Sequence, residues 1–321
     1  MKRVKLPPSS ASETALPPGR ADLVFRWITA ACAGLIVIVI LALVLELAWN
    51  SRLSLHRFGA GFLISRAWNP VTGEFGALSS IYGTLVSTAI AMLLAVPLAL
   101  ITALFLVELA PPRLSRVVGA GIELLAAIPS IIYGMWGLFV FAPFMAEHVE
   151  PALGRSLGFL PLFQGPPMGI GMLTAGVILA LMILPFICAV SRDVFQMVPA
   201  VVKESAYGLG ATTWEVTHKV TVRYGIRGII GAAFLGLGRA IGETMAVTFV
   251  IGNDHSFSAS LFDSGNSIAS TLANEFSEAS DPIYLSALVE LGLVLFFITA
   301  VVQALAQVWL GRMQKTMGGG M

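Results

Sequence analysis

The stretch GRAIGETMAV, residues 238–247, places Arg239 and Glu243 inside a run of apolar and small residues that extends from about 226 to 252. A membrane-spanning helix needs about 20 predominantly apolar residues, and this run is long enough. Five further runs of similar length occur at about 27–49, 80–107, 118–146, 168–190 and 284–311. The chain is therefore predicted to be an all-α integral membrane protein with six transmembrane helices.

The composition favours the same class. Of the 321 residues, 57% are hydrophobic and 12% are charged, whereas about 25% are charged in soluble domains. A net charge of +1 argues against a nucleic-acid-binding surface. The two cysteines, Cys32 and Cys188, both fall in apolar runs, so no disulfide framework is expected.

The distribution of Lys and Arg predicts the orientation. Six spans place both termini on one side, and with a cytoplasmic N-terminus fourteen Lys and Arg residues are inside and four are outside. The inner residues are five in the N-terminal tail, five between Arg192 and Arg227, and Arg113, Arg116, Arg312 and Lys315. The outer residues are Arg52, Arg57, Arg66 and Arg155. Both termini are thus predicted to be cytoplasmic.

This topology divides the chain into five parts. We expect a disordered cytoplasmic tail at 1–26, a first transmembrane helix at 27–49, a periplasmic loop at 50–79, a five-helix core at 80–311 and a cytoplasmic tail at 312–321. In the outer loop 253–283, Ile268, Leu272 and Phe276 are four residues apart. That spacing predicts a short helix, which either dips toward the membrane or covers the end of the bundle.

Motifs for catalysis are missing or misplaced. No Gly-Lys dipeptide occurs, so the chain has no P-loop, and the four histidines lack metal-ligand spacing. Residues 154–158, GRSLG, fit the nucleophile pattern G-x-S-x-G but lie in a short loop without the preceding strand that this turn requires. No catalytic residue, metal site or cofactor is expected in this chain, and it is predicted not to be an enzyme.

The cytoplasmic segment 191–225 is longer than a connection between two spans requires. An apolar side and a break at Gly208-Leu209-Gly210 predict a helix, a turn and a second helix. Thr212 and Glu215 have the spacing of a capping box at the start of the second helix. The segment either lies on the membrane surface as an amphipathic pair or docks a cytoplasmic partner.

Residues of this segment resemble the E-A-A loop of ABC importer permeases. Glu204, Ser205 and Ala206 are followed by Gly210 six residues after the glutamate, and then by Val-Thr-Val at 220–222. The resemblance implies that this loop inserts into an ATP-binding subunit and transmits ATP-driven closure to the spans. The chain departs from the pattern at Ser205, where the family has Ala, and at Arg223, where it usually has Pro.

Longer blocks resemble the C-type permease subunits of phosphate-specific transport systems. They include IELLAAIPSIIYGMWGLFVFAP at 122–143 and LGLGRAIGETMAVTFVIGN at 235–253. The resemblance implies a type I ABC importer permease fold in a bacterial inner membrane and a phosphate pathway. It also implies a heterodimer with an A-type permease, two copies of an ATP-binding subunit that carry ATP and magnesium, and a periplasmic phosphate-binding protein.

Arg239 and Glu243 are the predicted pathway residues. Arg239 lies 13 residues into its run, roughly 20 Å deep, where an arginine costs about 2.5–3.5 kcal/mol. Glu243 is four residues later, so a continuous helix would place both on one face as an ion pair. The pair either braces helices or offers the guanidinium to a passing anion. Gly238 and Gly242 form a GxxxG step for a close partner helix, which can belong to the second permease.

Four residues are weaker pathway candidates. Pro129 and Ser130 predict a kink whose freed carbonyls face the pathway, or a simple bend. Thr84 is a candidate polar lining residue, and Glu290 is an acidic residue within the last span with no identified partner.

Three readings of the function remain. The first is the permease of an ATP-driven phosphate importer, or of an importer of another oxyanion such as sulfate, molybdate or phosphonate. The second is a secondary anion transporter that works alone, and the third is an intramembrane enzyme. The 191–225 segment favours the first, because a lone carrier needs no socket for an ATPase. The third would require acids or histidines gathered at one membrane face, which the sequence lacks.

Overall fold

The computed structural model describes residues 20–318 of the chain, and this range is helical with no strand beyond isolated bridges. The tails predicted at 1–26 and 312–321 therefore fall partly outside the described residues; within the range, α1 begins at Arg20 and α15 continues to Gly318. The chain divides into two units, residues 1–46 and 47–321. The described part of the first unit is the beginning of helix α1, Arg20–Asn50.

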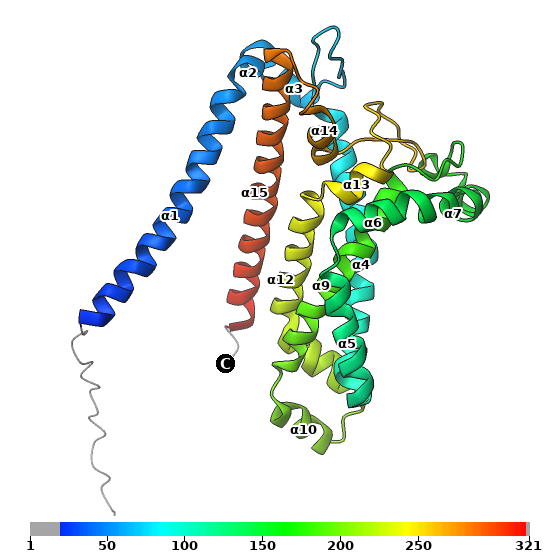
Figure 1. Cartoon of the computed structure of the whole chain (residues 1–321). Coiled ribbons are helices and arrows are strands. Elements are labelled where there is room, and N and C mark those ends of the chain that lie inside the picture. Colours follow the sequence, from blue (N-terminus) through cyan, green and yellow to red (C-terminus); the bar gives the residue numbers. More distant parts are fainter. Residues whose placement is uncertain (1–19, 319–321) are drawn as a thin grey trace, which may run out of the picture. The chain divides into compact units, whose positions relative to one another are not determined.

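The second unit contains the end of α1 and the other helices drawn in Figure 1. Its longer elements are α4 (Leu78–Leu104), α5 (Pro112–Ala126), α9 (Met172–Gln196), α12 (Arg223–Ile241) and α15 (Pro282–Gly318). Its shorter ones are α2 (Arg52–Phe58), α3 (Gly61–Ile64), α6 (Ser130–Trp136), α7 (Ala142–Phe144), α8 (Glu150–Leu157), α10 (Ala200–Gly208), α11 (Thr213–Glu215), α13 (Met245–Val250) and α14 (Ile268–Glu275). Wider π turns, η1 (Phe105–Leu109), η2 (Gly137–Phe141), η3 (Met145–Val149) and η5 (Val216–Val222), continue neighbouring helices, and η4 (Pro161–Phe163) is a short 3₁₀ turn.

The prediction of an all-α chain with six membrane-spanning helices is confirmed. Within residues 20–318, six helical stretches are long and apolar enough to cross a membrane. They are Ala21–Asn50, Leu78–Leu109, Ser130–Leu157, Met172–Gln196, Thr213–Ile241 and Pro282–Arg312.

Helix α9 is the central helix of the second unit. Its apolar stretch is 61% buried, against at most 28% for the other spans. Ala91, Ala95, Ala99 and Ala103 of α4 recur every fourth residue and are all fully buried in the core that contains α9. Small side chains on one helical face allow close approach, and α4 accordingly packs along α9 over most of its length.

A second apolar core lies at the end of the bundle that carries α14, here called the α14 end. It contains Phe62, Phe75, Ile268, Tyr284 and Leu288. The helix predicted from the spacing of Ile268 and Leu272 is therefore present as α14, and its first residues are buried against α4, α13 and α15. The opposite end, which carries α10, is here called the α10 end (Figure 1).

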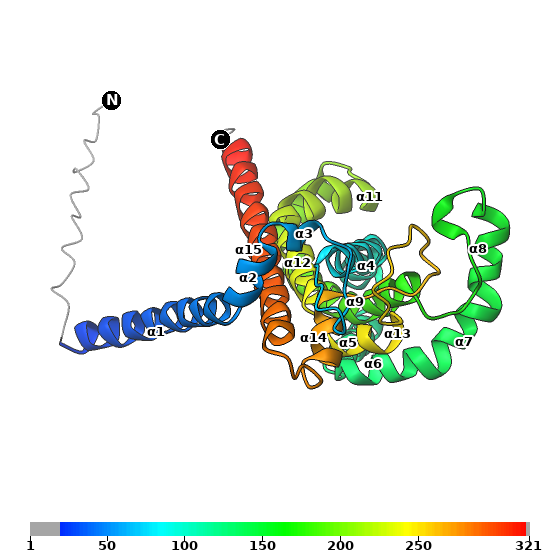
Figure 2. The same ribbon diagram turned by 90° about the horizontal axis from the view of Figure 1, so that it is seen from above.

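The third predicted span, 118–146, is wrong as a single helix. Helix α5 ends at Ala126, and residues 127–129 are not helical. Helical structure resumes at Ser130 and runs to Leu157. Pro129 removes one backbone donor and disfavours helix at the residue before it, which accounts for the break. Both views show α6 to α8 turning away from α5 and α9 at this point (Figure 1, Figure 2).

The fifth predicted span, 226–252, is also wrong as a single helix. Helix α12 ends at Ile241, and α13 begins at Met245 after a short break. The fifth span begins earlier than predicted, because a continuous helix starts at Thr213 and runs through η5 into α12. Helix α13 then packs closely on α6: a β-carbon added at Gly134 would lie 3.0 Å from the Met245 carbonyl oxygen.

Candidate functional site

The 191–225 segment forms a short helix and a turn at the α10 end. Helix α10 is followed by a turn in which Gly210 adopts φ 87°, a left-handed conformation that favours glycine. Thr212 then accepts from the backbone of Glu215, and the Glu215 carboxylate accepts from the Thr212 amide. The predicted capping box is confirmed, but the second helix is the beginning of the fifth span rather than a separate element.

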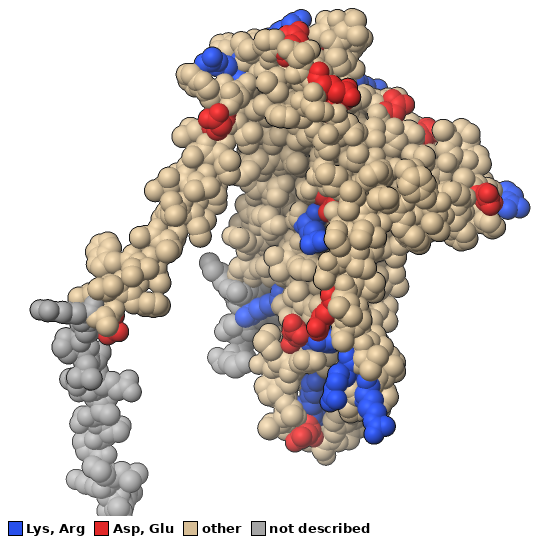
Figure 3. All heavy atoms as spheres, in the orientation of Figure 1, with Lys and Arg blue, Asp and Glu red and all other residues tan. Residues whose placement is uncertain are grey.

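The outer face of this segment is apolar and uncovered in the isolated chain. Met197 is 69% exposed, Val201 71%, Leu209 90% and Trp214 74%. Large exposed apolar side chains gathered on one face mark a contact surface for another protein or for the membrane. On helix α10, Glu204 and Ser205 are exposed and Ala206 is half-buried. Lys and Arg side chains gather at this end on the face drawn in Figure 3.

Glu108, in η1 at the end of α4, anchors this segment to the bundle. One carboxylate oxygen, Oε1, accepts from Lys203 Nζ at 2.6 Å and from Thr221 Oγ1 at 2.9 Å. The Glu108 side chain is 7% exposed and that of Lys203 is 17% exposed. Sequence reasoning missed this contact because the partners are far apart in the chain and no periodic pattern links them.

Arg239 and Glu243 do not form the predicted ion pair. The break after Ile241 removes the helical face that the two side chains would share, and Glu243 Oε1 instead accepts from the Ala246 amide at 3.3 Å. A carboxylate at the start of a helix is favourable, because it satisfies an amide with no partner inside the helix. The four ion pairs of the described side chains involve neither residue.

Arg239 is exposed on the surface of the isolated chain in spite of its apolar surroundings. Its guanidinium carbon lies 6.0 Å from the ring centroid of Phe186, near the middle of the 25-residue helix α9. The arginine therefore lies about halfway along the bundle and is exposed there, with its donors available to a ligand or to another subunit.

The glycines of α12 mostly serve contacts within this chain. A β-carbon at Gly228 would lie 2.5 Å from Val194, and one at Gly236 would lie 2.6 Å from Ile187, both on α9. At Gly238 it would lie 2.6 Å from Gln303 Nε2 of α15. A β-carbon at Gly231 would meet nothing within 4 Å, and one at Gly242 would meet only the Gly238 carbonyl oxygen, at 3.7 Å, so these two positions leave space for a helix of another subunit.

The weaker candidates have separate environments. Pro129 lies at the corner between α5 and α6, and Ser130 begins α6. The Leu125 carbonyl accepts from the Ile128 amide at 3.3 Å and from the Tyr133 hydroxyl at 3.0 Å, so this carbonyl is satisfied within the chain.

Thr84 and Glu290 are both buried at the α14 end. Thr84 is 2% exposed and accepts from the Ile268 amide at 2.9 Å, which fastens α4 to the start of α14. Glu290 is 3% exposed, and its Oε2 has no hydrogen-bond partner among the described residues. The structure brings neither of them to Arg239.

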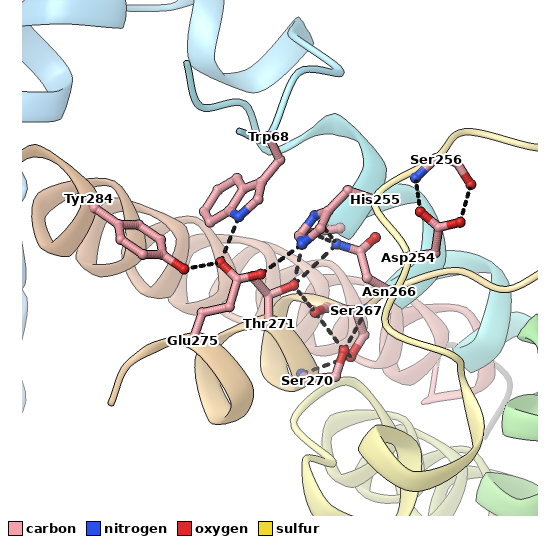
Figure 4. A network of polar contacts seen from close by, with 11 residues as sticks. Trp68, Asp254, His255, Ser256, Asn266, Ser267, Ser270, Thr271, Glu275 and Tyr284 are labelled. Carbon is pink, nitrogen blue, oxygen red and sulfur yellow. Dashed lines mark hydrogen bonds and ion pairs between the residues drawn. The ribbon is translucent and has the colours of Figure 1, made fainter. Parts of the chain in front are cut away.

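A polar network at the α14 end joins segments that are distant in sequence (Figure 4). Glu275 of α14 accepts from Trp68 Nε1 and from the Tyr284 hydroxyl, both at 2.6 Å, and lies 2.8 Å from His255 Nε2. The Trp68 and His255 rings are stacked, with centroids 5.2 Å apart and planes 7° apart. One carboxylate thus holds the 65–77 loop, the 251–267 loop and α15 together.

Asn266 extends this network into the buried part of α4. Its side-chain nitrogen lies 2.7 Å from Ser80 Oγ, 3.1 Å from Thr271 Oγ1 and 2.8 Å from His255 Nδ1. An amide nitrogen carries two hydrogens, so it donates to at most two of these three neighbours at once. Sequence reasoning marked α14 but not these partners, since the histidine is isolated in sequence.

The network changes the acidity of Glu275. Burial raises the pKa of this carboxyl, but the hydrogen bonds from His255, Tyr284 and Trp68 outweigh burial, so its pKa is lowered below the ordinary value. A carboxyl with a lowered pKa stabilises the folded state above its unfolded pKa, about 4.3 for glutamate. That contribution is lost as the pH falls through the lower, folded value.

We expect the α14 end to loosen only below about pH 4.3. The emission of Trp68, taken as the difference between wild type and Trp68→Phe, should change with a midpoint below that pH. The Glu275→Gln variant cannot titrate at this position and should lack the transition. A midpoint above the ordinary glutamate value, or the same transition in Glu275→Gln, would contradict this assignment.

The sequence matches a known family over most of its length. Residues 95–315 match the family described as binding-protein-dependent transport system inner membrane component. The chain is 52% identical over 301 residues to the phosphate transport system permease protein PstC of Mesorhizobium japonicum, covering 92% of each. It is 48% identical over 316 residues to PstC of Xylella fastidiosa, covering 95% of this chain and 97% of that protein.

Two solved structures of ABC transporters have a similar fold. A bacterial alginate ABC transporter, solved in complex with an alginate pentasaccharide-bound periplasmic protein, is similar with a TM-score of 0.59 and 15% identity, over 92% of this chain and 97% of that chain. The inward-facing methionine ABC transporter MetNI is similar with a TM-score of 0.55 and 18% identity, over 73% and 94%. At these identities the likeness concerns the fold alone.

Proposed function

This chain belongs to the binding-protein-dependent transport system inner membrane components, and we propose that it is the transmembrane permease subunit of an ATP-driven importer of inorganic phosphate. The observation that carries the proposal is the sequence identity to phosphate transport permeases, which is 52% over 92% of this chain. A permease subunit is a non-enzymatic membrane component, so the work of this chain is to bind, orient and release the ion.

The α10 end is the cytoplasmic side in this proposal, and the membrane is the bacterial inner membrane. The excess of Lys and Arg in 1–26 and 191–227 supports this orientation. The exposed apolar face at Met197, Val201 and Leu209 fits a surface depression in an ATP-binding subunit. That subunit is present in two copies, and it binds ATP and magnesium. Glu204, Ser205, Ala206 and Gly210 belong to this contact, as the resemblance to the E-A-A loop implies.

Arg239 and Glu243 contribute to the pathway in this proposal. Arg239 is exposed halfway along the bundle, where a second, A-type permease would face it and complete the path. A guanidinium matches phosphate oxygens with two parallel hydrogen bonds, which an ammonium cannot do. Glu243 fixes the start of α13 beside it and, as a like charge, prevents the anion from binding tightly at this point. A periplasmic phosphate-binding protein supplies the ion at the α14 end.

The proposal is tested by uptake of labelled phosphate in cells that lack this chain and regain it. Uptake should return with the chain and should be reduced by unlabelled phosphate or arsenate but not by sulfate. Competition by sulfate, molybdate or phosphonate in preference to phosphate would assign another oxyanion. Purified protein that carries no ATPase subunit and still moves phosphate would favour a carrier that works alone.

Gly210→Ala tests the docking of the ATPase. A residue with a β-carbon in this left-handed conformation costs about 1–2 kcal/mol, so the turn of the variant relaxes in the free permease. Docking has to restore the turn, and binding of the ATPase should weaken about 5- to 30-fold. The matched control is Gly208→Ala, because Gly208 also has open space around it but a helical backbone. Retention of the ATPase on the purified permease at increasing salt measures the effect, and equal retention by both variants would contradict it.

A further inference from the structure

Glu108 connects the two arms of the 191–225 segment to the end of α4. Lys203 lies in α10, before the turn at Gly210, and Thr221 lies in η5, after it. Both donate to the same oxygen of Glu108, at 2.6 and 2.9 Å. The turn that would contact the ATPase is therefore closed at its base by one carboxylate.

This ion pair differs in kind from the exposed pair of Lys219 and Glu215 in the same segment. Lys219 and Glu215 are 68% and 40% exposed and are four residues apart on one helix, so water screens their attraction and they fasten nothing beyond that helix. Lys203 and Glu108 are mostly buried and belong to different helices. A buried ion pair is strongly destabilised when only one partner is removed, because the remaining charge lacks a counter-charge.

Helix α4 extends this connection across the bundle. It has 27 residues, about 40 Å in length. At its far end, Thr84 accepts from the start of α14 and Ser80 accepts from Asn266. Between these two ends the buried alanine face packs α4 closely against α9, on both sides of the internal Pro97. A continuous set of contacts thus leads from α10 through Glu108 and α4 to the polar network of Figure 4.

We propose that Glu108 is a positioning residue that transmits the movement of α10 to α4, and through α4 to the α14 end. This inference rests on the proposed function, because it assumes an ATPase that moves α10. When that subunit closes, the charged anchor makes α4 follow α10, so that hydrolysis and opening of the path occur together. Without the anchor, α10 moves with the ATPase while α4 stays behind.

The test uses the complete transporter in proteoliposomes with the phosphate-binding protein, and measures phosphate transported per ATP hydrolysed. Glu108→Gln keeps the shape of the side chain and removes its charge. In this variant, the phosphate transported per ATP hydrolysed should fall about fivefold or more, while hydrolysis continues in the partner subunit. A factor of about five is the lower limit of typical energetic coupling between two sites of a protein. Lys203→Gln should behave in the same way, and the exchange Glu108→Lys with Lys203→Glu should recover at least half of the wild-type ratio.

Two further variants keep the test decisive. Lys219→Gln breaks the exposed pair of the same segment and should leave the ratio unchanged. If Glu108→Gln fails to assemble, Thr221→Val removes a single neutral donor and should still lower the ratio. A wild-type ratio in Glu108→Gln or, where that variant fails to assemble, in Thr221→Val would overturn the inference. Failure of the wild-type transporter to move phosphate would overturn the proposed function instead.

Discussion

Replacing Arg239 by glutamine is expected to lower the initial rate of phosphate uptake by about 10- to 150-fold, because hydrogen bonds to a charged group contribute about 1.5–3 kcal/mol. Glutamine retains one donor group but loses the charge and the two parallel donors that match a phosphate edge. The arginine is exposed and forms no ion pair within the described chain, so its removal leaves no buried charge behind. The complex should therefore assemble, and labelled phosphate uptake at several concentrations measures the loss.

Arg227→Gln is the matched control for this prediction. Arg227 is exposed on the same helix, three turns closer to the α10 end, and should tolerate the change with uptake close to wild type. Arg239→Lys keeps the charge without the planar fork and should give an intermediate rate. Wild-type uptake by an assembled Arg239→Gln transporter would show that Arg239 only braces helices.

Gly83→Ala should prevent normal folding at the α14 end. A β-carbon at this position of α4 would lie 1.9 Å from the Asn266 carbonyl oxygen and 3.0 Å from its carbonyl carbon. These are backbone atoms in a segment held by Ser80 and Thr84, so they cannot move aside cheaply. Overpacking of this kind costs about 1–3 kcal/mol or more. Thermal unfolding of the detergent-solubilised protein should shift down by at least about 3 °C, with less protein recovered from membranes.

Gly121→Ala provides the comparison. Gly121 lies within helix α5, and an added β-carbon would meet nothing within 4 Å. Alanine is the better helix former by about 1 kcal/mol, so this variant should be as stable as wild type or more stable. Equal thermal unfolding of the two alanine variants would mean that the contact between α4 and Asn266 is looser than the structure shows.

Features that depend on neighbouring residues could be predicted from the sequence. The lengths of the apolar runs gave six spans, the spacing of Thr212 and Glu215 gave a cap, and the spacing of Ile268 and Leu272 gave α14. A kink at Pro129 was predicted, but the end of the helix at Ala126 and the break after Ile241 were missed. Apolar content reports whether a run can lie in a membrane, but it does not distinguish one helix from two.

Contacts between distant residues could not be predicted in this way. The pairing of Arg239 with Glu243 was expected because four residues form one turn of a continuous helix, and it failed when the helix ended at Ile241. The anchor at Glu108 and the partners of Glu275 depend on which helices pack together. That information lies in the whole arrangement and not in any short stretch.

The two breaks, at 127–129 and at 242–244, have a mechanical consequence. Helix α6 follows the first break and α13 follows the second, and Gly134 lets the two helices press together closely. Residues outside regular helices can change their backbone angles at low cost, so each break can act as a hinge. Because α6 and α13 pack on each other, a change of backbone angles at either break would move the two helices together as one unit. Arg239 lies on α12, one turn before the second break, so it would keep its place on α12 while the two helices move beside it.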